Sequence, residues 1–430
     1  MSKKRAASSV QNLLLVLLTA SALFLLSRTP LFSVGWRDRM QAIFTAGPQA
    51  GGQAQAVDLG TLVPSFHAVI TDEAEYGRYG RLYVPVEDGL FLQLSPLLRD
   101  AMGSAGEGAR VAEETLWDAL DTPSVYLDLT VRLPAPAIAA CLGAEGGDPD
   151  LTARYLALTT EDAGGARLYL ADGEGTVFRC ETALPVSAIR ELAEEFAPNS
   201  AGIAFESYYA TLSPYTVLVA DFPAPPEVSG EVPPGCTLDN LLEALDFNTH
   251  IMSSYTDPAG AEVVGETPRT LRFAPGGSVT YTGDQTVVSP LYRVSAAGEE
   301  PTAREALQAA AALAGLLTES TGASPLSLQS LAPTASGWRA AFRCQAGGIP
   351  VLLSGGGDLA EEEALSVTIT GRTITAFSYR CRLYTPLENE ALFIPPIQAA
   401  ALASVYPDAD LSIGYLDNGA GTLSPQWLAG

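Results

Sequence analysis

The amino-acid sequence predicts an α+β protein in which an N-terminal transmembrane helix precedes antiparallel-sheet domains with helices packed on one face. Three features lead to this prediction: a long apolar segment near the start, short strands separated by glycine-rich turns, and amphipathic stretches between them. Hydrophobic residues make up 47% of the 430 residues, and the mean hydropathy is +0.17. This content can fill buried cores, and the length predicts about two or three packing units.

The apolar segment runs without a charged residue from Ala6 to Ser27 and would span roughly 33 Å as a helix, enough to cross a bilayer. A Lys-Lys-Arg cluster at residues 3–5 precedes it and is expected to stay in the cytoplasm, which places everything after Arg28 outside the cell membrane. A cleaved signal peptide is the alternative. Residues 27–32 offer no A-x-A cleavage pattern, so the sequence favours an uncleaved single-span anchor.

Four small residues, Thr19, Ala20, Ser21 and Ala22, interrupt the leucine run of this segment. Small residues let two membrane helices approach closely, and hydroxyl groups can hydrogen-bond between helices. We therefore predict that these residues contact a partner helix. The alternative is ordinary variation on a lipid-facing helix.

The expected organisation follows from shifts in composition along the chain. The predicted parts are a cytoplasmic tip and transmembrane helix (1–28), a juxtamembrane linker (29–61), an N-terminal extracellular α+β domain (62–234), a middle α+β domain (235–300) and a C-terminal α+β meander domain (301–430). The boundary near residue 234 lies in PAPPEVSGEVPPG (223–235), whose paired prolines are expected to exclude a strand.

Hydrophobic periodicity and turn residues predict the elements within these parts. Helices are expected at 90–103, 109–120, 187–196, 237–254, 302–320 and 397–406, with Thr237 or Asp239 as the cap of the fourth. Strands are expected at 65–72, 80–86, 124–133 and 216–222, and a final meander begins after residue 336. Gly347-Gly348 and residues 370–372 are its predicted hairpin turns.

The sequence favours binding over catalysis. A formal net charge of −25, from 49 acidic and 24 basic residues, makes nucleic-acid binding improbable because such a surface repels phosphates. No HExxH, GxSxG, SxxK, Walker or CxxC motif occurs. His67 is expected to be a structural histidine in an apolar strand, and His250 has no partner at a functional spacing. The glycine run 355–357 is expected to be a hairpin tip, and the acidic runs 194–195 and 361–363 solvated faces. We predict no catalytic residue, no cofactor and no metal site.

The five cysteines are widely scattered, which argues against a disulfide framework or a zinc site. Cys344 and Cys381 each alternate in phase with aromatic residues of the last meander, so they are expected to face the same side. A disulfide would join them if they were directly opposed. Two buried free thiols are the alternative.

Two stretches of the chain resemble a known family. Residues 245–283 are similar to the middle domain of the YycH-type regulators, and the last unit resembles the C-terminal domain shared by YycH and YycI. The overall length and N-terminal anchor are nearer YycH. The residues that carry the resemblance are Phe247-Asn248, Tyr255, Gly260, Thr270-Leu271-Arg272, Gly277, Val279, Tyr281, Phe342, Gly347-Gly348-Ile349-Pro350-Val351, Val367-Thr368-Ile369, Phe377, Tyr379-Arg380, Ile413, Tyr415 and Pro425-Gln426-Trp427.

The resemblance implies an accessory protein that regulates the WalK (YycG) sensor histidine kinase of cell-wall homeostasis. It also implies contact between the membrane helix and the kinase's membrane helices, and pairing of the ectodomain with a YycI-like paralogue. Two alternatives stay open: a general envelope-binding or scaffold protein, and an anchored hydrolase. A deep pocket that gathers carboxylates around His67 or His250 would favour the hydrolase.

Overall fold

The structure of this chain is a computed structural model, which divides after residue 53 into two units. It describes residues 57–73, 77–148, 150–161, 165–206, 211–220, 222–248, 250–287, 289–295, 298, 300–353, 363–406, 408–419 and 421–429, all in the second unit. No helix among these residues is long and apolar enough to cross a membrane. The expected transmembrane helix lies outside the described residues.

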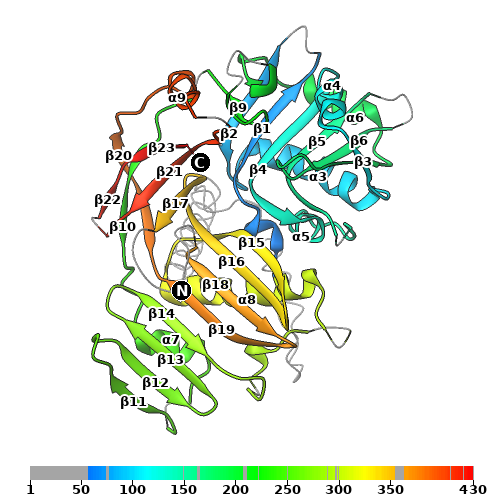
Figure 1. Cartoon of the computed structure of the whole chain (residues 1–430). Coiled ribbons are helices and arrows are strands. Elements are labelled where there is room, and N and C mark those ends of the chain that lie inside the picture. Colours follow the sequence, from blue (N-terminus) through cyan, green and yellow to red (C-terminus); the bar gives the residue numbers. More distant parts are fainter. Residues whose placement is uncertain are drawn as a thin grey trace, which may run out of the picture. The chain divides into compact units, whose positions relative to one another are not determined.

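The first sheet has seven antiparallel strands in the order β2-β1-β4-β5-β6-β7-β3 (Figure 1). The strands are β1 (Phe66–Thr71), β2 (Arg78–Val84), β3 (Ala109–Val111), β4 (Ser124–Pro134), β5 (Thr152–Thr159), β6 (Arg167–Ala171) and β7 (Val177–Glu181). The interior strand β4 is buried along most of its length, because both faces of the sheet are covered.

Helices α3 (Gly89–Ser104) and α5 (Ala135–Cys141) cover one face of this sheet, where their apolar side chains meet Leu127 of β4 and Leu156 of β5. The opposite face is also covered, whereas the sequence predicted helices on one face only. There the Tyr215 ring stacks 4.3 Å from the Tyr155 ring, and Trp117 of α4 (Glu113–Ala119) lies 4.8 Å from Tyr215. Helix α6 (Val186–Ala193) matches the helix expected at 187–196.

The second sheet has eleven strands in the order β11-β12-β13-β14-β19-β18-β16-β17-β21-β23, with β15 paired to β16. Only β17 and β21 pair in parallel among its described strands. The strands are β11 (Ser253–Thr256), β12 (Glu262–Glu266), β13 (Arg269–Ala274), β14 (Ser278–Thr282), β15 (Leu326–Thr334), β16 (Gly337–Ala346), β17 (Ile349–Leu353), β18 (Leu365–Thr370), β19 (Thr373–Arg380), β21 (Leu411–Asp417) and β23 (Pro425–Ala429).

Helix α8 (Ala303–Thr321) packs on β15, β16 and β18 of the second sheet, and its boundaries match the prediction. Thr302 and Glu305 form a reciprocal capping box at its start, in which the Thr302 side chain accepts from the Glu305 amide and the Glu305 carboxylate accepts from the Thr302 amide. Gly322 ends the helix in the left-handed conformation. Local sequence signals therefore define both ends of this helix.

A strand occupies the stretch that was expected to be a domain boundary. Residues 226–231 form β10 (Pro226–Glu231), the central strand of a three-stranded sheet between β20 (Leu383–Glu390) and β22 (Thr422–Leu423). The expectation that the prolines exclude a strand was wrong, because Pro226 is the first residue of β10 and the other prolines lie outside the strand. The expected units are also joined by pairing, since β14 of the middle unit pairs with β19 of the last one.

The helix expected at 237–254 is shorter. Helix α7 (Leu238–Ala244) begins at the Thr237 cap, as one of the two predicted options, but ends where Asp246 adopts a positive φ of 56°. The Arg269 guanidinium donates to the carbonyl oxygens of Leu245 (3.1 Å) and Asp246, which satisfies this helix end. The helix expected at 109–120 is likewise shorter, because its first three residues pair with β7 as strand β3.

The remaining elements are short. They are the two-stranded sheet of β8 (Gly202–Ile203) and β9 (Val217–Leu218), the 3-10 helices η2 (Leu59–Leu62), η4 (Ala204–Glu206) and η5 (Pro290–Tyr292), and helix α9 (Pro396–Ala403). The larger hydrophobic core is continuous from the first sheet to the second. A separate small cluster lies beneath α9.

The predicted turn at Gly347-Gly348 is confirmed and provides a test of the packing between the sheets. Both glycines have positive φ (59° and 84°), and Ala346 pairs with Ile349 across them. A Cβ on Gly348 would lie 2.5 Å from the Tyr83 carbonyl oxygen of the first sheet, whereas a Cβ on Gly347 would meet nothing within 4 Å.

We expect Gly347→Ala to lower the free energy of unfolding by about 1 kcal/mol, the cost of the left-handed conformation alone. We expect Gly348→Ala to cost about 1–3 kcal/mol more, because the new methyl group displaces the Tyr83 backbone. Urea denaturation of both variants measures the difference. Equal losses for the two variants would contradict the close approach of β2 to this turn.

Candidate binding surface

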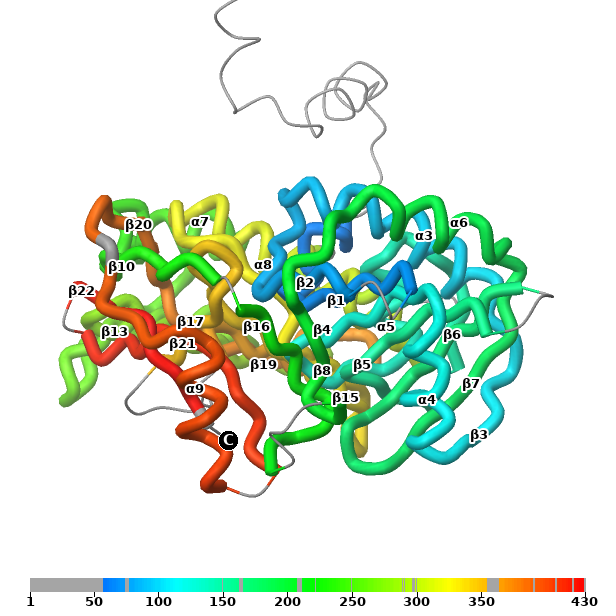
Figure 2. The backbone as a smooth tube through the Cα atoms, turned by 90° about the horizontal axis from the view of Figure 1, so that it is seen from above, coloured from blue at the N-terminus to red at the C-terminus, as the bar shows by residue number. Residues whose placement is uncertain are grey.

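Helix α9 and its flanks expose an apolar surface. The stretch from residue 391 to residue 407 contains no charged side chain. Six large hydrophobic residues in it are 44% to 104% exposed, and we call them the α9 surface: Leu392, Ile394, Ile397, Leu402, Val405 and Tyr406. Helix α9 lies at the periphery of the described structure in both views (Figures 1 and 2). Exposed apolar side chains that gather on one element indicate an interaction site.

The orientation of α9 is the reverse of an ordinary surface helix. Its alanines Ala399, Ala400 and Ala403 are buried against a small cluster that includes Leu411, while Ile397 and Leu402 point outward. A surface helix normally turns its larger apolar residues toward the core. Small side chains on the inner face let the helix lie close to β21, and the larger residues are left available for a partner.

The segment that leads into α9 is fixed in place. The Phe393 ring stacks on the Trp427 ring with centroids 5.1 Å apart, and the Trp427 Nε1–H donates to the Ile394 carbonyl oxygen at 2.8 Å. Pro395 and Pro396 begin the helix, where proline is well tolerated. The α9 surface is therefore held on the structure by specific contacts.

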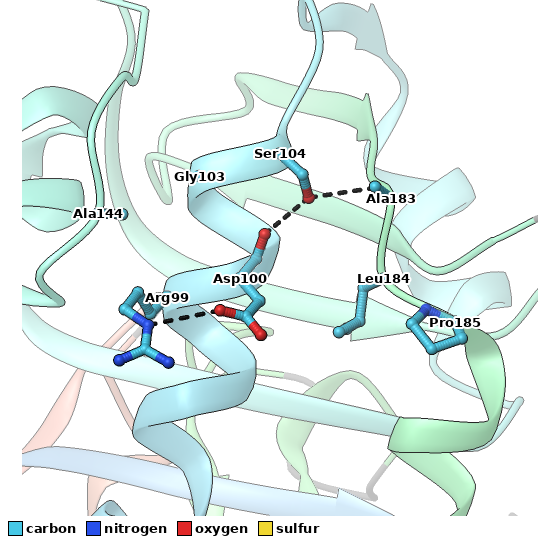
Figure 3. Close-up of a pocket in the computed structure, with 8 residues that line it drawn as sticks. All are labelled: Arg99, Asp100, Gly103, Ser104, Ala144, Ala183, Leu184 and Pro185. Atoms are coloured by element: carbon cyan, nitrogen blue, oxygen red, sulfur yellow. Dashed lines mark hydrogen bonds and ion pairs between the residues drawn. The ribbon is translucent and has the colours of Figure 1, made fainter.

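A surface pocket of about 420 Å³ lies beside α3 (Figure 3). Arg99 and Asp100 line it, and the Arg99 Nε lies 3.4 Å from Asp100 Oδ1. The Ser104 hydroxyl donates to the Asp100 carbonyl oxygen at 2.6 Å and accepts from the Ala183 amide at 3.1 Å. Its lining holds a single carboxylate and no histidine, whereas an acid–base hydrolase requires two cooperating groups.

His67 belongs to a buried cluster of charged residues. Its Nδ1 lies 3.6 Å from Asp128 Oδ2, and Arg154 donates to both Asp128 oxygens at 2.8 and 2.9 Å. The same guanidinium reaches Asp410, just before β21, at 2.5 Å. Burial acts to raise the pKa of Asp128, but Arg154 and His67 together hold this pKa below its usual range.

This arrangement makes His67 a structural residue that joins strands β1 and β4. Its ring meets the Tyr83 ring edge-on at 4.5 Å, and its Nε2 is buried without a hydrogen-bond partner, so the histidine is only half satisfied. Neither His67 nor His250 lines the two cavities found beside α3. Neither cavity is therefore the histidine-containing pocket that would have favoured a hydrolase.

Further polar contacts continue from this cluster and join the first sheet to the second. The Ser65 hydroxyl donates to the Gly348 carbonyl oxygen and accepts from Gln345 Nε2 at 3.1 Å. Arg343 of β16 donates to the Thr130 hydroxyl at 2.5 Å, and the Tyr83 hydroxyl accepts from the Ile413 amide. We call this set, with His67, Asp128, Arg154 and Asp410, the polar seam.

The polar seam predicts a pH dependence of stability. Burial lowers the pKa of His67 in the folded chain, so the unfolded chain binds the proton first as the pH falls. Stability from this residue is fully present above its unfolded pKa near 6.5 and is lost below it. We expect unfolding to become easier by about 1 kcal/mol between pH 6.5 and pH 5.5.

The sequence contains only two histidines, which makes the assignment testable. Urea denaturation at several pH values measures how the free energy of unfolding changes with pH. His67→Gln should remove the decrease between pH 6.5 and pH 5.5, and His250→Gln, at an exposed turn position, should keep it. If His67→Gln kept the pH dependence of the unaltered chain, His67 would not be its source.

The other predicted residues fall in different places. Thr19, Ala20, Ser21 and Ala22, the Gly355–Gly357 run and Glu361-Glu362 lie outside the described residues. Glu194-Glu195 is exposed as expected, but Glu363 is buried because it pairs with Arg339 through bonds of 2.5 and 2.9 Å. Cys344 and Cys381 are both buried free thiols. No group of three His, Cys, Asp or Glu side chains among the described residues is arranged to hold a metal.

The α9 surface and the polar seam were not identified from the sequence. The absence of charge from residue 391 to residue 407 was a usable signal for the α9 surface. Arg154 and Asp410 are 256 residues apart, and no spacing rule connects them.

Comparison with known proteins shows the fold. No family model matches the chain, and no curated protein matches its sequence. The crystal structure of YycH from Bacillus subtilis superposes with a TM-score of 0.53 at 11% identity, and the match covers 88% of this chain and 96% of that one. An uncharacterized protein from Eubacterium rectale matches with a TM-score of 0.29 at 12% identity, covering 48% of this chain and 76% of that one. The chain has a YycH-type fold, which confirms the resemblance to YycH and extends it beyond the two stretches that predicted it.

Proposed function

We propose that this protein is a membrane-anchored extracellular accessory protein that regulates a sensor histidine kinase of cell-wall homeostasis. The observation that carries the proposal is the YycH-type fold over 88% of the chain. The family resemblance of residues 245–283 and of the last unit implies this role. The net charge of −25 suits a body that stays soluble outside the membrane and binds neither nucleic acid nor anionic lipid.

In this proposal the two ends of the chain make different contacts. Residues 6–27 span the membrane, and Thr19, Ala20, Ser21 and Ala22 pack against a membrane helix of the kinase. The α9 surface, at the periphery of the ectodomain, binds the ectodomain of a YycI-like paralogue. A large uncharged apolar surface suits a stable protein partner, because its burial removes apolar area from water. The protein acts by binding and not by catalysis.

Co-purification from detergent-solubilised membranes tests the proposal. We expect the tagged full-length chain to recover the sensor histidine kinase encoded beside its gene. Thr19→Leu with Ser21→Leu should reduce this recovery while membrane insertion is kept. Recovery of wall-assembly proteins without a kinase would instead support the scaffold function. A mature chain that is found free in the medium, cleaved after residue 27, would contradict anchoring.

A further inference from the structure

The thiols of Cys236 and Cys381 lie in one buried cluster. Cys236 stands in the turn between β10 and α7, and Cys381 directly follows β19. Their exposed fractions are 7% and 0%. The Cys381 thiol interacts with the side chains of Cys236, Thr321 and Tyr379, and the hydroxyl groups of Thr321 and Tyr379 lie 3.4 Å apart. The partner of Cys381 is therefore Cys236, 145 positions away in the sequence, and not the Cys344 that its alternation pattern suggested.

The surrounding backbone holds the two segments together independently of the thiols. The Cys381 amide donates to the Gly277 carbonyl oxygen at 2.9 Å, and a Cβ on Gly277 would lie 2.9 Å from the Cys381 carbonyl oxygen and 3.1 Å from Val232 Cγ1. A Cβ on Gly235 would lie 2.6 Å from the Thr321 carbonyl oxygen. Val232 therefore lies against Gly277, which also packs on Cys381, and Gly235 lies against the end of α8.

The local chemistry suits exchange between the two sulfurs. The hydrogen bond from the Cys236 thiol lowers the pKa of Cys381 and raises that of Cys236. Arg382 also helps to lower the pKa of Cys381. A thiol whose pKa is lowered by a neighbouring thiol is the arrangement of a nucleophilic and a resolving cysteine.

We propose that Cys236 and Cys381 form a disulfide in the mature protein. This inference rests on the proposed function only in requiring that the ectodomain meets an oxidising environment outside the cytoplasm. The oxidant is the disulfide of a dithiol oxidase, which reaches the pair during folding, before burial closes it.

The exchange conserves atoms and electrons. The Cys381 thiolate attacks the oxidase disulfide, which forms a mixed disulfide and releases one oxidase thiolate. The Cys236 thiolate then attacks the Cys381 sulfur, which releases the second. Two cysteine thiols are oxidised, one oxidase disulfide is reduced to a dithiol, and the two protons end on the oxidase sulfurs.

The bond would tie the β10–α7 turn to the junction between β19 and β20. Strand β10 is the central strand of its sheet, with Glu231 opposite Leu383, so the cross-link closes a large loop at a position where pairing already holds the chain. In the chain-entropy account, closing a loop of this size reduces the unfolded population by roughly several thousandfold.

Tryptic cleavage separates the three relevant cysteines onto different peptides. Cleavage after arginine places Cys236 in residues 191–269, Cys344 in residues 344–372 and Cys381 in the dipeptide 381–382. We expect the full-length chain, refolded in detergent in a glutathione redox buffer and then alkylated, to give the first and third peptides joined by a disulfide. The peptide containing Cys344 should be alkylated.

Variants and whole cells complete the test. Cys344→Ala and the matched control Cys180→Ala should keep the cross-link, and Cys236→Ala should abolish it. Acid-quenched cells should yield Cys236 and Cys381 protected from alkylation until a reductant is added. A Cys344–Cys381 peptide, or free Cys236 and Cys381 in both samples, would overturn the proposal. Kinase co-purification is a separate measurement, so either idea can fail while the other stands.

Discussion

Replacing Ile397 and Leu402 with glutamine is expected to reduce recovery of the co-expressed YycI-like paralogue by roughly tenfold or more. Both side chains are exposed, at 46% and 62%, and point away from the alanine face of α9. Glutamine is a good helix former, so the helix itself should be retained. Removal of the apolar groups takes away only what a partner would bury. The amount of paralogue recovered with the tagged full-length chain is the measurement.

Leu92 on α3 provides the matched control, because it is a 51% exposed leucine outside the α9 surface. Leu92→Gln should leave recovery of the paralogue unchanged. If the α9 double variant recovers as much paralogue as Leu92→Gln does, the α9 surface is not the site of contact. The YycH-type fold would stand in that case, but the proposed ectodomain pairing would need another surface.

Replacement of Arg154 by methionine is expected to lower the free energy of unfolding by about 3–5 kcal/mol. The guanidinium is the common partner of Asp128, whose side chain is 3% exposed, and of Asp410. Its removal leaves a buried carboxylate whose remaining partners are the Thr130 amide, at 2.7 Å, and a histidine whose pKa burial lowers. Denaturation of the full-length chain in urea measures the loss.

Two further variants distinguish the stability lost by leaving a buried charge unpaired from the stability lost by removing packing contacts. Arg132→Met removes an exposed pair with Glu174 and should cost less than about 1 kcal/mol. Adding Asp128→Asn to Arg154→Met should recover part of the loss, because the uncompensated charge disappears. An Arg154→Met variant as stable as Arg132→Met would show that the polar seam contributes little to folding.

Local signals predicted much of the fold. The ends of α8 could be predicted because Thr302, Glu305 and Gly322 act within a few residues of the helix. The hairpin at Gly347-Gly348 was predictable for the same reason, since positive φ at two adjacent residues favours glycine. Such features need no knowledge of the rest of the chain.

Features that depend on distant residues were missed or wrong. Strand β10 was missed, in a stretch expected to be a domain boundary, because its pairing partners, β20 and β22, lie more than 150 residues further along. The helix at α9 was predicted, but not which side of it is exposed, because that depends on the cluster with Leu212 and Leu411. On alternation, Cys344 was the candidate disulfide partner of Cys381, with two free thiols as the alternative, whereas Cys381 interacts with Cys236 from a turn in another part of the sequence.

The placement of β10 has a consequence for biogenesis. A ribosome releases residues 226–231 long before residues 383–390 and 422–423 exist, so this strand has neither neighbour while the roughly 150 residues between β10 and β20 are made. An unpaired strand in a nascent chain exposes amide and carbonyl groups that other chains can capture. Completion of the fold therefore depends on the final residues, and a premature stop that removes them would leave β10 and β21 as open edges prone to aggregation.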